Sequence, residues 1–266
     1  MFLSLNGELI EEKDMKIFPL GEDFMYGYGL FETVKIQNNK TIFMKEHVKR
    51  LLKGCIILDL DIEWNYNDIE NFASELIKRN GVINGALKII YCKNIKGNNL
   101  IIIWKDIVYN RECYEKGFKL CFCDYKKNPY SPLVYLKTNN YLDNIFNKKR
   151  IQAKGYDEGI FLNVNNKVCE GTFTNIFFVK NSIIYTPSRE CGLLEGIIRE
   201  KVINLARELR IELIIKEIEG NDLLSADEIF ITNSLMEIMP VSRLENKELS
   251  LKINYITKTL MKNLED

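Results

Sequence analysis

The chain has 266 residues, of which 46% are hydrophobic and 11% are aromatic. Such a chain can bury one large core or two smaller ones, and we predict two lobes, an N-terminal α+β lobe at residues 1–115 and a C-terminal α/β lobe at residues 116–266. The 37 basic and 37 acidic residues give a formal charge of zero. This balance argues against nucleic acid and anionic membrane surfaces as partners, because both attract a net positive charge.

The cysteines and the apolar runs predict where the protein works. There are seven cysteines, an odd number, and no C-x-x-C pair. The segment MFLSLNGELIEEKD lacks the features of a secretory signal, and the apolar run NNLIIIWKDIV is shorter than the roughly 20 residues that a membrane-spanning helix needs. We therefore expect a cytoplasmic protein with reduced cysteines and no membrane association.

Apolar spacing predicts the elements of the first lobe. Asn6-Gly7 is a strong hairpin signal, so residues 1–6 and 8–11 are predicted to pair as strands. In the strand predicted at residues 30–37, Phe31 and Thr33 share one face because side chains alternate along a strand. Further predicted elements are helices at residues 44–58 and 67–80, the second capped by Asn67, and strands at residues 86–93 and 100–108.

The second lobe is predicted to begin with a strand at residues 118–124 and a turn-rich loop at residues 126–132, which leads to Lys137 at the start of a helix. That helix, at residues 139–154, has Leu142, Ile145 and Phe146 on an apolar face. The remaining predicted elements are strands at residues 158–163, 167–170, 175–180, 183–186, 211–218 and 228–232, helices at residues 196–210 and 251–264, and a short turn capped by Asn221.

Two residues of the second lobe could handle a reactive cofactor. A lysine is usually a solvated surface charge, but partial burial between the loop and the apolar helix would favour the neutral amine of Lys137 and let it react with an aldehyde. Glu170 is followed by Gly171 and Thr172 at a strand end. An exposed acid is the common interpretation, whereas a buried carboxylate here could hold a pyridine nitrogen protonated and make the ring an electron sink.

Other residues could hold a phosphate. The first backbone N–H groups of a helix lack internal partners, so the segment Gly196, Ile197 and Ile198 could bind an anion, although it could also be a helix start and nothing more. The guanidinium fork of Arg50 suits a bidentate phosphate contact, although most arginines lie at the surface. Ser234 follows a predicted buried strand and adds further donors.

Several other chemistries find no support in the sequence. His47 is the only histidine and is interpreted as structural, which argues against a His-dependent serine or cysteine hydrolase. Cys121 and Cys123 have no second pair nearby in sequence to complete a zinc site, so no metal is predicted. Neither G-x-G-x-x-G after a strand nor G-x-x-x-x-G-K-[ST] occurs, which argues against dinucleotide and P-loop binding.

Six segments in order resemble the class IV aminotransferases, the fold-type-IV family of pyridoxal 5'-phosphate (PLP) enzymes. They are GYGLFETVKI, KEHVKRL, LKTNNYLDN, DEGIFLNVNNKVCEGTFTNIFFVKNSIIYTP, GLLEGIIRE and EIFITNSLMEIMPV, and they span nearly the whole chain. The resemblance implies the two-lobed α+β fold of the D-amino-acid aminotransferase-like enzymes, PLP as cofactor, a small-molecule substrate and a homodimer.

The resemblance also implies roles for individual residues. Lys137 would be the Schiff-base lysine, and Glu170 would pair with the pyridine nitrogen. The hydroxyl of Thr33 would face the cofactor and assist proton transfer. The remaining implied contacts are those of Arg50, Ile197, Ile198 and Ser234 with the phosphate and of Leu194 with the ring.

Within the family, the segments FET and TNSLMEIMPV look most like aminodeoxychorismate lyase, which makes p-aminobenzoate for folate. Glycine in place of Thr33 would suggest a branched-chain transaminase, and LKIIYCKN lacks the Arg-x-His pair of the D-amino-acid transaminases. Tyr28, Ile198 and Glu237 depart from the family pattern, where aspartate, threonine and glycine are frequent. The alternatives are a branched-chain or D-amino-acid transaminase and, more remotely, a PLP-binding protein without catalysis.

Overall fold

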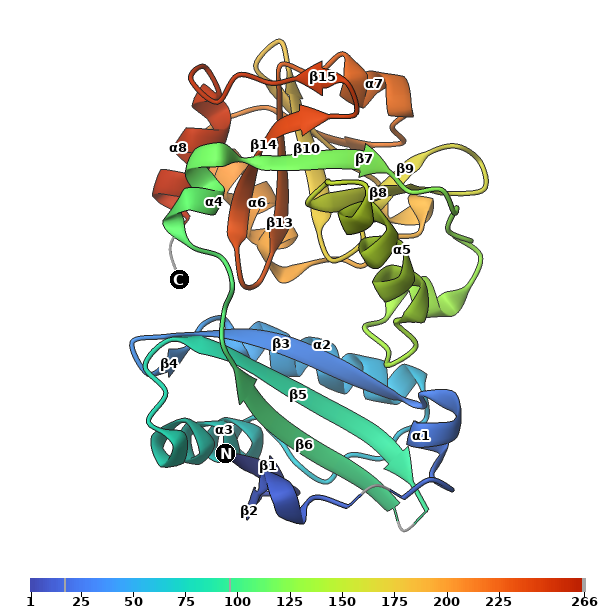
Figure 1. Cartoon of the computed structure of the whole chain (residues 1–266), viewed down its shortest axis with the longest axis vertical. Helices are drawn as coiled ribbons and strands as arrows, with labels where there is room; N and C mark the ends of the chain where they lie inside the picture. Colours follow the sequence, from blue (N-terminus) through green and yellow to red (C-terminus); the bar gives the residue numbers. More distant parts are fainter. Residues whose placement is uncertain (17, 96, 265–266) are drawn as a thin grey trace. The chain divides into compact units, whose positions relative to one another are not determined.

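The computed structural model describes residues 1–16, 18–95 and 97–264, which form two compact units (Figure 1). Unit 1 comprises the described residues of Met1–Val108 together with Leu136–Tyr141, and unit 2 comprises Tyr109–Tyr135 and the described chain from Leu142 onward. The segment with Lys137, which we expected in the C-terminal lobe, therefore groups with unit 1. The reason is that its backbone pairs with a strand of that unit.

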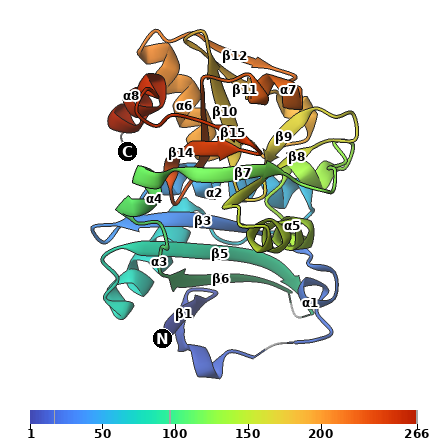
Figure 2. The ribbon, with the colours of Figure 1, turned by 45° about the horizontal axis from the view of Figure 1, so that its top comes forward.

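Unit 1 is built on an antiparallel sheet whose strands β3, β5 and β6 run side by side in Figure 2. The strand order is β2-β1-β6-β5-β3-β4. The predicted hairpin, strands and two long helices of this region are confirmed to within a few residues. Their bounds are β1 Phe2–Leu5, β2 Glu8–Glu11, α1 Glu22–Tyr26, β3 Gly29–Gln37, β4 Lys40–Thr41, α2 Met44–Ile57, α3 Tyr66–Asn80, β5 Gly85–Asn94 and β6 Gly97–Lys105.

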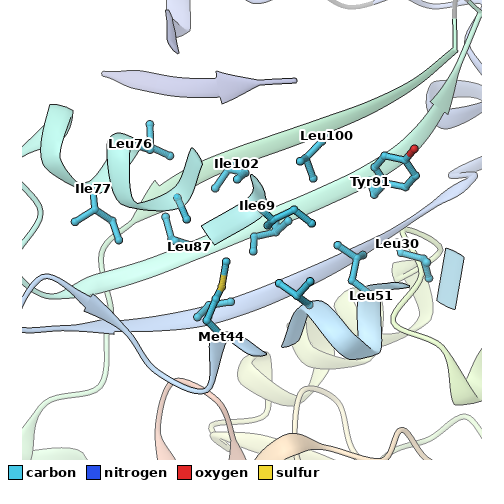
Figure 3. Packing of buried hydrophobic residues seen from close by; sticks show 14 of the residues in the cluster. Leu30, Met44, Leu51, Ile69, Leu76, Ile77, Leu87, Tyr91, Leu100 and Ile102 are labelled. Carbon is cyan, nitrogen blue, oxygen red and sulfur yellow. The ribbon is translucent and has the colours of Figure 1, made fainter. Parts of the chain in front are cut away.

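The core of unit 1 lies between one face of this sheet and the helices α2 and α3. Alternate residues of β3, β5 and β6 point into it, and the helices contribute residues at the three- and four-residue spacing of one helical face. Removing these apolar side chains from water holds the two helices against this face of the sheet. Figure 3 shows the members Leu30, Leu51, Ile69, Leu87, Tyr91 and Ile102.

Unit 2 is built on a mixed sheet of order β12-β11-β10-β13-β14-β7-β8-β9, with β15 paired to β14. Strand β7 runs parallel to both of its neighbours, β14 and β8. The bounds are α4 Arg111–Lys116, β7 Phe118–Phe122, α5 Leu142–Ala153, β8 Glu158–Leu162, β9 Val168–Gly171, β10 Asn175–Lys180, β11 Ile183–Pro187, α6 Ile197–Glu208, β12 Leu213–Lys216, α7 Gly220–Leu224, β13 Glu228–Asn233, β14 Glu237–Leu244, β15 Lys247–Glu248 and α8 Tyr255–Asn263.

Helices cover parts of this second sheet. Helices α6 and α8 pack against β13, α8 also packs against β14, and α5 packs against β8. The sheet curls so that β9 lies near β10 and β11 as well as beside β8. In the part of the chain that the structure describes, no helix is long and apolar enough to cross a bilayer. The buried side chains of this core include Ile176, Phe178, Ile229, Ile231, Met239 and Val241.

Two predicted helix caps are wrong by two residues. The side chain of Asn65, not Asn67, accepts the first N–H groups of α3, and Asp68 bonds back to the backbone of Asn65. This reciprocal pattern is a capping box. Helix α7 likewise begins after Glu219 rather than at Asn221. Both real caps are polar residues just before the helix, so the chemistry of the cap was right and its position was wrong.

The apolar face predicted for α5 is not its buried face. Leu142 is 75% exposed and Phe146 is 46% exposed, whereas Asn144, Asn147 and Ile151 are buried. Burial of the asparagines is possible because their amides are satisfied. Asn144 donates to a backbone carbonyl of unit 2 at 2.6 Å, and Asn147 donates to a carbonyl one turn earlier at 2.8 Å.

Leu51→Ala tests the core between α2 and the sheet. Leu51 is 2% exposed, and removing its buried methyl groups should lower the free energy of unfolding by about 2–5 kcal/mol because a cavity is left. Ile56→Ala, on the same helix, is the matched control, since Ile56 is 79% exposed and should change stability by about 0.5 kcal/mol or less. Urea unfolding measures both, and equal losses would contradict the assigned core.

Candidate active site

The backbone around Lys137 is held by pairing with β3. The N–H of Phe31 donates to the carbonyl of Lys137 at 2.8 Å, and the N–H of Asn139 donates to the carbonyl of Gly29 at 2.9 Å. An antiparallel bridge lies between these two bonds. The short segment before α5 thus extends the sheet of unit 1, and this pairing sets where the amine of Lys137 lies.

The ammonium of Lys137 lies over aromatic rings. Its Nζ is 4.4 Å from the ring centroid of Phe31 and 5.4 Å from that of Tyr141. The two rings meet edge to face, 5.2 Å apart. Thr33 projects from the same face of β3 as Phe31, because side chains alternate along a strand. The amine of Lys137 and the side chain of Thr33, two predicted site residues, therefore lie on the same side of β3.

A second amine lies on this face. Lys88 of β5 is directly opposite Thr33 in the strand register, and its Nζ is 4.7 Å from the ring centroid of Phe31. Burial lowers the pKa of Lys88, and the charge of Lys105 adds to the shift. Two amines near one ring make this face electropositive, which suits a small molecule with negative charge.

Arg50 lies on the opposite side of β3. Its Nε donates to Oε1 of Glu32 at 2.7 Å and its Nη2 donates to Oε2 at 2.7 Å, so the guanidinium fork is bidentate on this carboxylate. His47, one helical turn earlier in α2, brings its Nδ1 within 2.7 Å of Oε2. The Glu32 and His47 side chains are fully buried, whereas Arg50 is 21% exposed. The structure therefore does not bring Arg50 to the strand face of Thr33.

The charges in this cluster follow from burial and contact. Burial alone would raise the pKa of Glu32, but the charge of Arg50 and the hydrogen bonds from Arg50 and His47 outweigh it and lower the pKa to about 2. Burial lowers the pKa of His47, and Glu32 offsets part of that shift. At neutral pH Glu32 is thus ionised and His47 is neutral. An ionised carboxylate only accepts, so Nδ1 of His47 carries the hydrogen.

In unit 2, Glu170 lies in β9 and is 7% exposed. Its Oε1 forms an ion pair with Nζ of Lys127, and its Oε2 accepts the N–H of Leu194 at 3.0 Å. The side-chain amide of Asn175 donates to the carbonyl of Leu194 at 2.8 Å and fixes the same segment. Glu170 and Leu194, both predicted cofactor contacts, are therefore in direct contact with each other.

The start of α6 follows this segment. Gly196 is the N-cap, and a Cβ there would lie 2.0 Å from Oδ1 of Asn175. Only glycine therefore fits at this position without displacing Asn175. The side chains of Ile197 and Ile198 are buried, while the N–H groups of the first turn have no acceptor inside the helix. The backbone N–H groups at the start of this helix can donate hydrogen bonds to a phosphate.

Ser234 lies in the turn between β13 and β14 and is half-buried. The side chain of Asn233 accepts two N–H groups of this turn at 2.9 Å each, which fixes its shape. Thr232 pairs in register with Asn175, so this turn lies at the same end of the sheet as the Leu194 segment. The hydroxyl of Thr232 is buried and makes no hydrogen bond to any described residue.

Three residues that contact the predicted site residues were not predicted from the sequence. Glu32 and Lys127 form ion pairs with Arg50 and Glu170, and Asn175 orders the segment that begins α6. One signal was available for Glu32. Strand alternation places its side chain on the face of β3 that Thr33 does not share, and this face is the one covered by the helix that carries Arg50. For Lys127 the sequence offered only its place in a turn-rich loop.

Comparison with known proteins gives a consistent result. Residues 29–244 match the model of the family described as amino-transferase class IV. Aminodeoxychorismate lyase of Bacillus subtilis (strain 168) is 30% identical over 258 residues, which is 91% of this chain and 86% of that protein. A putative branched-chain-amino-acid aminotransferase of Methanocaldococcus jannaschii is 29% identical, and the match covers 100% of this chain and 96% of that protein.

The fold is also shared with solved structures. One of them is the crystal structure of a putative 4-amino-4-deoxychorismate lyase from Legionella pneumophila, which superposes with a TM-score of 0.88 at 26% identity. The match covers 96% of this chain and 98% of that chain. The expectation of the two-lobed α+β fold of the fold-type-IV aminotransferases is therefore confirmed.

Glu32→Gln tests the buried cluster through its pH dependence. The pKa of Glu32 falls from an ordinary 4.5 to about 2 on folding, which corresponds to about 3 kcal/mol of stability. Because the folded pKa is the lower one, this contribution is complete above pH 4.5 and is lost as the pH falls toward 2. Urea unfolding should show wild type about 3 kcal/mol more stable than the variant at pH 7, with the difference closing between pH 4.5 and 2.

The control for this series is Glu8→Gln, which removes an exposed carboxylate from β2. It should change stability by no more than about 0.5 kcal/mol at any of these pH values. A Glu32→Gln penalty that is the same at pH 7 and at pH 2 would show that the loss comes from packing rather than from charge.

Proposed function

Because the chain belongs to the class IV aminotransferase family and is an enzyme of its lyase or transaminase type, we propose that it is a PLP-dependent aminodeoxychorismate lyase. It would convert 4-amino-4-deoxychorismate to p-aminobenzoate, a folate precursor, and pyruvate. We further propose that it works in the cytoplasm as a homodimer. Residues that face the substrate distinguish a lyase from a transaminase, because both types of enzyme in the family share their cofactor chemistry.

The donor groups of the chain fit PLP. The amine of Lys137 would hold the aldehyde carbon covalently, and the carboxylate of Glu170 would accept the N–H of the pyridine ring. The buried Thr232 hydroxyl, which has no partner among the described residues, and a helix start where only glycine fits are both features of a site that receives a polar ligand. The phosphate contacts would come from Arg50, Ile197, Ile198 and Ser234, and the ring contact from Leu194.

Arg50 would act on the phosphate while its fork is held by Glu32. Two of its N–H groups already bond this carboxylate, so the guanidinium has little freedom to turn. A donor that is fixed before the ligand arrives loses less entropy on binding. The positive charge of Arg50 is also balanced by Glu32, so its contribution would be mainly one of hydrogen-bond direction.

The proton transfers can be assigned to residues of the Lys137 face. When bound, PLP supplies an electron sink for a carbanion next to the substrate's amino group. Lys137, released by the incoming amine, would remove the proton from the carbon that carries that amino group. Thr33 would assist this transfer with its hydroxyl. Loss of pyruvate then leaves an aromatic ring, which makes the reaction irreversible in practice.

The observation that carries the lyase assignment is Thr33 on the strand face over which the Lys137 amine lies. A hydroxyl at this point can take part in proton transfer at the substrate, whereas glycine would provide only space. The electropositive surroundings with Lys88 suit a substrate that carries carboxylates. The similarity to the B. subtilis lyase over most of the chain supports the same choice.

A branched-chain transaminase is the second candidate, favoured by the nearly equal identity to the M. jannaschii protein. It would use the same Lys137 but return the proton to the cofactor and release a keto acid. A D-amino-acid transaminase is less favoured, because the sequence lacks the Arg-x-His pair in LKIIYCKN.

The direct test gives the PLP-loaded protein freshly generated 4-amino-4-deoxychorismate and follows p-aminobenzoate and pyruvate together. We expect the two products in equal amounts. Production of glutamate from 2-oxoglutarate and a branched-chain or D-amino acid, with no p-aminobenzoate, would contradict the lyase assignment and identify a transaminase.

Thr33→Ala should retain PLP and lose turnover. Because the hydroxyl would assist proton transfer, kcat should fall by about 10²–10⁴-fold, the usual contribution of general acid–base catalysis. Thr33→Ser, which restores the hydroxyl, should recover most of the rate. The absorbance of bound cofactor measures loading in both variants, and full activity of Thr33→Ala would exclude the proposed role.

A further inference from the structure

Lys127 is fixed next to Glu170 by main-chain bonds as well as by its charge. Its N–H donates to the carbonyl of Leu162 at 2.9 Å, and its own carbonyl accepts the N–H of Val164 at 3.0 Å. The residue thus pairs with the end of β8. Its Nζ lies 5.1 Å from the ring centroid of Phe161 and contacts Oε1 of Glu170. The lysine that contacts the carboxylate is therefore part of the sheet framework.

The ion pair is largely removed from solvent. The Lys127 side chain is 13% exposed and that of Glu170 is 9% exposed. On the other oxygen, Oε2 accepts the N–H of Leu194. The side-chain amide of Asn175 lies 3.5 Å from the same oxygen as a further donor. Each carboxylate oxygen has two lone pairs, so Oε1, which is bonded to Lys127, can still accept one more donor. A charged contact at this depth is stronger than one in water.

We propose that Lys127 is a positioning residue that acts through Glu170 to keep the cofactor's ring nitrogen protonated. This inference rests on the proposed function, in which Glu170 accepts the N–H of the pyridine ring. One proton can reside on either group, giving a neutral acid beside a neutral ring or a carboxylate beside a pyridinium. The transfer moves one proton and leaves the total charge unchanged.

The ammonium of Lys127 decides between these two arrangements by distance. It touches the carboxylate, so it is strongly stabilised when Glu170 is negative. It must be farther from a ring that binds to Glu170 as a separate partner, so its repulsion of a pyridinium is weaker, because Coulomb energy falls with distance. The net effect favours the proton on the ring. Without Lys127, burial would favour the two neutral groups instead.

A purely structural ion pair is the competing interpretation. It would stabilise the connection between β8 and β9 without any effect on the state of a bound cofactor. Stability measurements alone do not separate the two interpretations, because a buried lysine beside an acid is expected to matter for folding in either case. A probe of the ring nitrogen itself is needed.

The experiment loads wild type and Lys127→Met with PLP labelled with ¹⁵N in the ring and records the nitrogen chemical shift at pH 7. Wild type should show the shift of a protonated pyridinium. Lys127→Met should show a shift displaced toward that of the neutral pyridine base, and Lys127→Arg should return it toward wild type. An identical shift in wild type and Lys127→Met would overturn the proposal.

The neighbouring Lys126 provides a matched control. It is exposed, and its ammonium contacts Asn166 rather than an acid, so Lys126→Met should leave the nitrogen shift unchanged. If Lys127→Met does not fold, Lys127→Gln keeps a donor to Glu170 without the charge and should show the same displacement. An unchanged shift in Lys127→Gln would also overturn the proposal.

A double-variant comparison separates this inference from the proposed function. In a Glu170→Gln background the carboxylate is absent, so adding Lys127→Met should cause no further displacement of the nitrogen shift. A further displacement of the same size as in wild type would show that Lys127 does not act through Glu170. Failure of wild type to bind labelled PLP would instead contradict the proposed function itself.

Discussion

The antiparallel pairing of the Lys137 segment with β3 is the contact on which the candidate site depends. Two backbone bonds, from Phe31 to Lys137 and from Asn139 to Gly29, attach a segment from the middle of the sequence to a strand near its beginning. Because a strand alternates its side chains, the same three residues of β3 serve both of its faces. The ring of Phe31 contacts the amine and Thr33 lies on the same face, whereas Glu32 between them contacts the helix that carries Arg50.

In each unit a buried carboxylate forms an ion pair, and the pairing has a geometric consequence. Glu32 holds Arg50 and His47 in unit 1, and Lys127 holds Glu170 in unit 2. A buried ion pair adds little net stability compared with apolar packing, because both charges lose their hydration. What it does provide is a fixed direction for each polar group. In the proposed function, Arg50 and Glu170 are groups whose direction toward a cofactor matters.

Much of the fold follows from local patterns in the sequence. The Asn6-Gly7 hairpin and the amphipathic helices α2 and α6 are where turn chemistry and apolar spacing predict them. Strand β14 was not predicted. It contains Pro240, a residue type that is rare in the middle of a sheet, which pairs in register with Phe230 of β13. The predicted buried face of α5 was wrong because the buried amide of Asn144 is satisfied by a bond to a carbonyl 28 residues away, which no local pattern records.

The candidate site was predictable in part for the same reason. Lys137, Glu170 and the start of α6 lie in segments whose order along the chain is characteristic of the family. The ion-pair partners of the predicted site residues are distant in the sequence. Glu32 is 18 residues from Arg50, and Lys127 is 43 residues from Glu170. Such contacts are made by tertiary folding, and propensity or spacing contains no information about them. The pairing of β3 with the Lys137 segment, which is about 100 residues away in the sequence, likewise cannot be predicted from local patterns.

We propose that Lys137 is the residue that holds the cofactor, and chemical mapping of the labelled lysine is the measurement that tests this role. The PLP-loaded protein is reduced with borohydride, digested, and analysed by mass spectrometry for the peptide that carries the phosphopyridoxyl group. We expect a single labelled position, at Lys137. Labelling of Lys88, the other amine beside the Phe31 ring, or of any other lysine in place of Lys137 would contradict it.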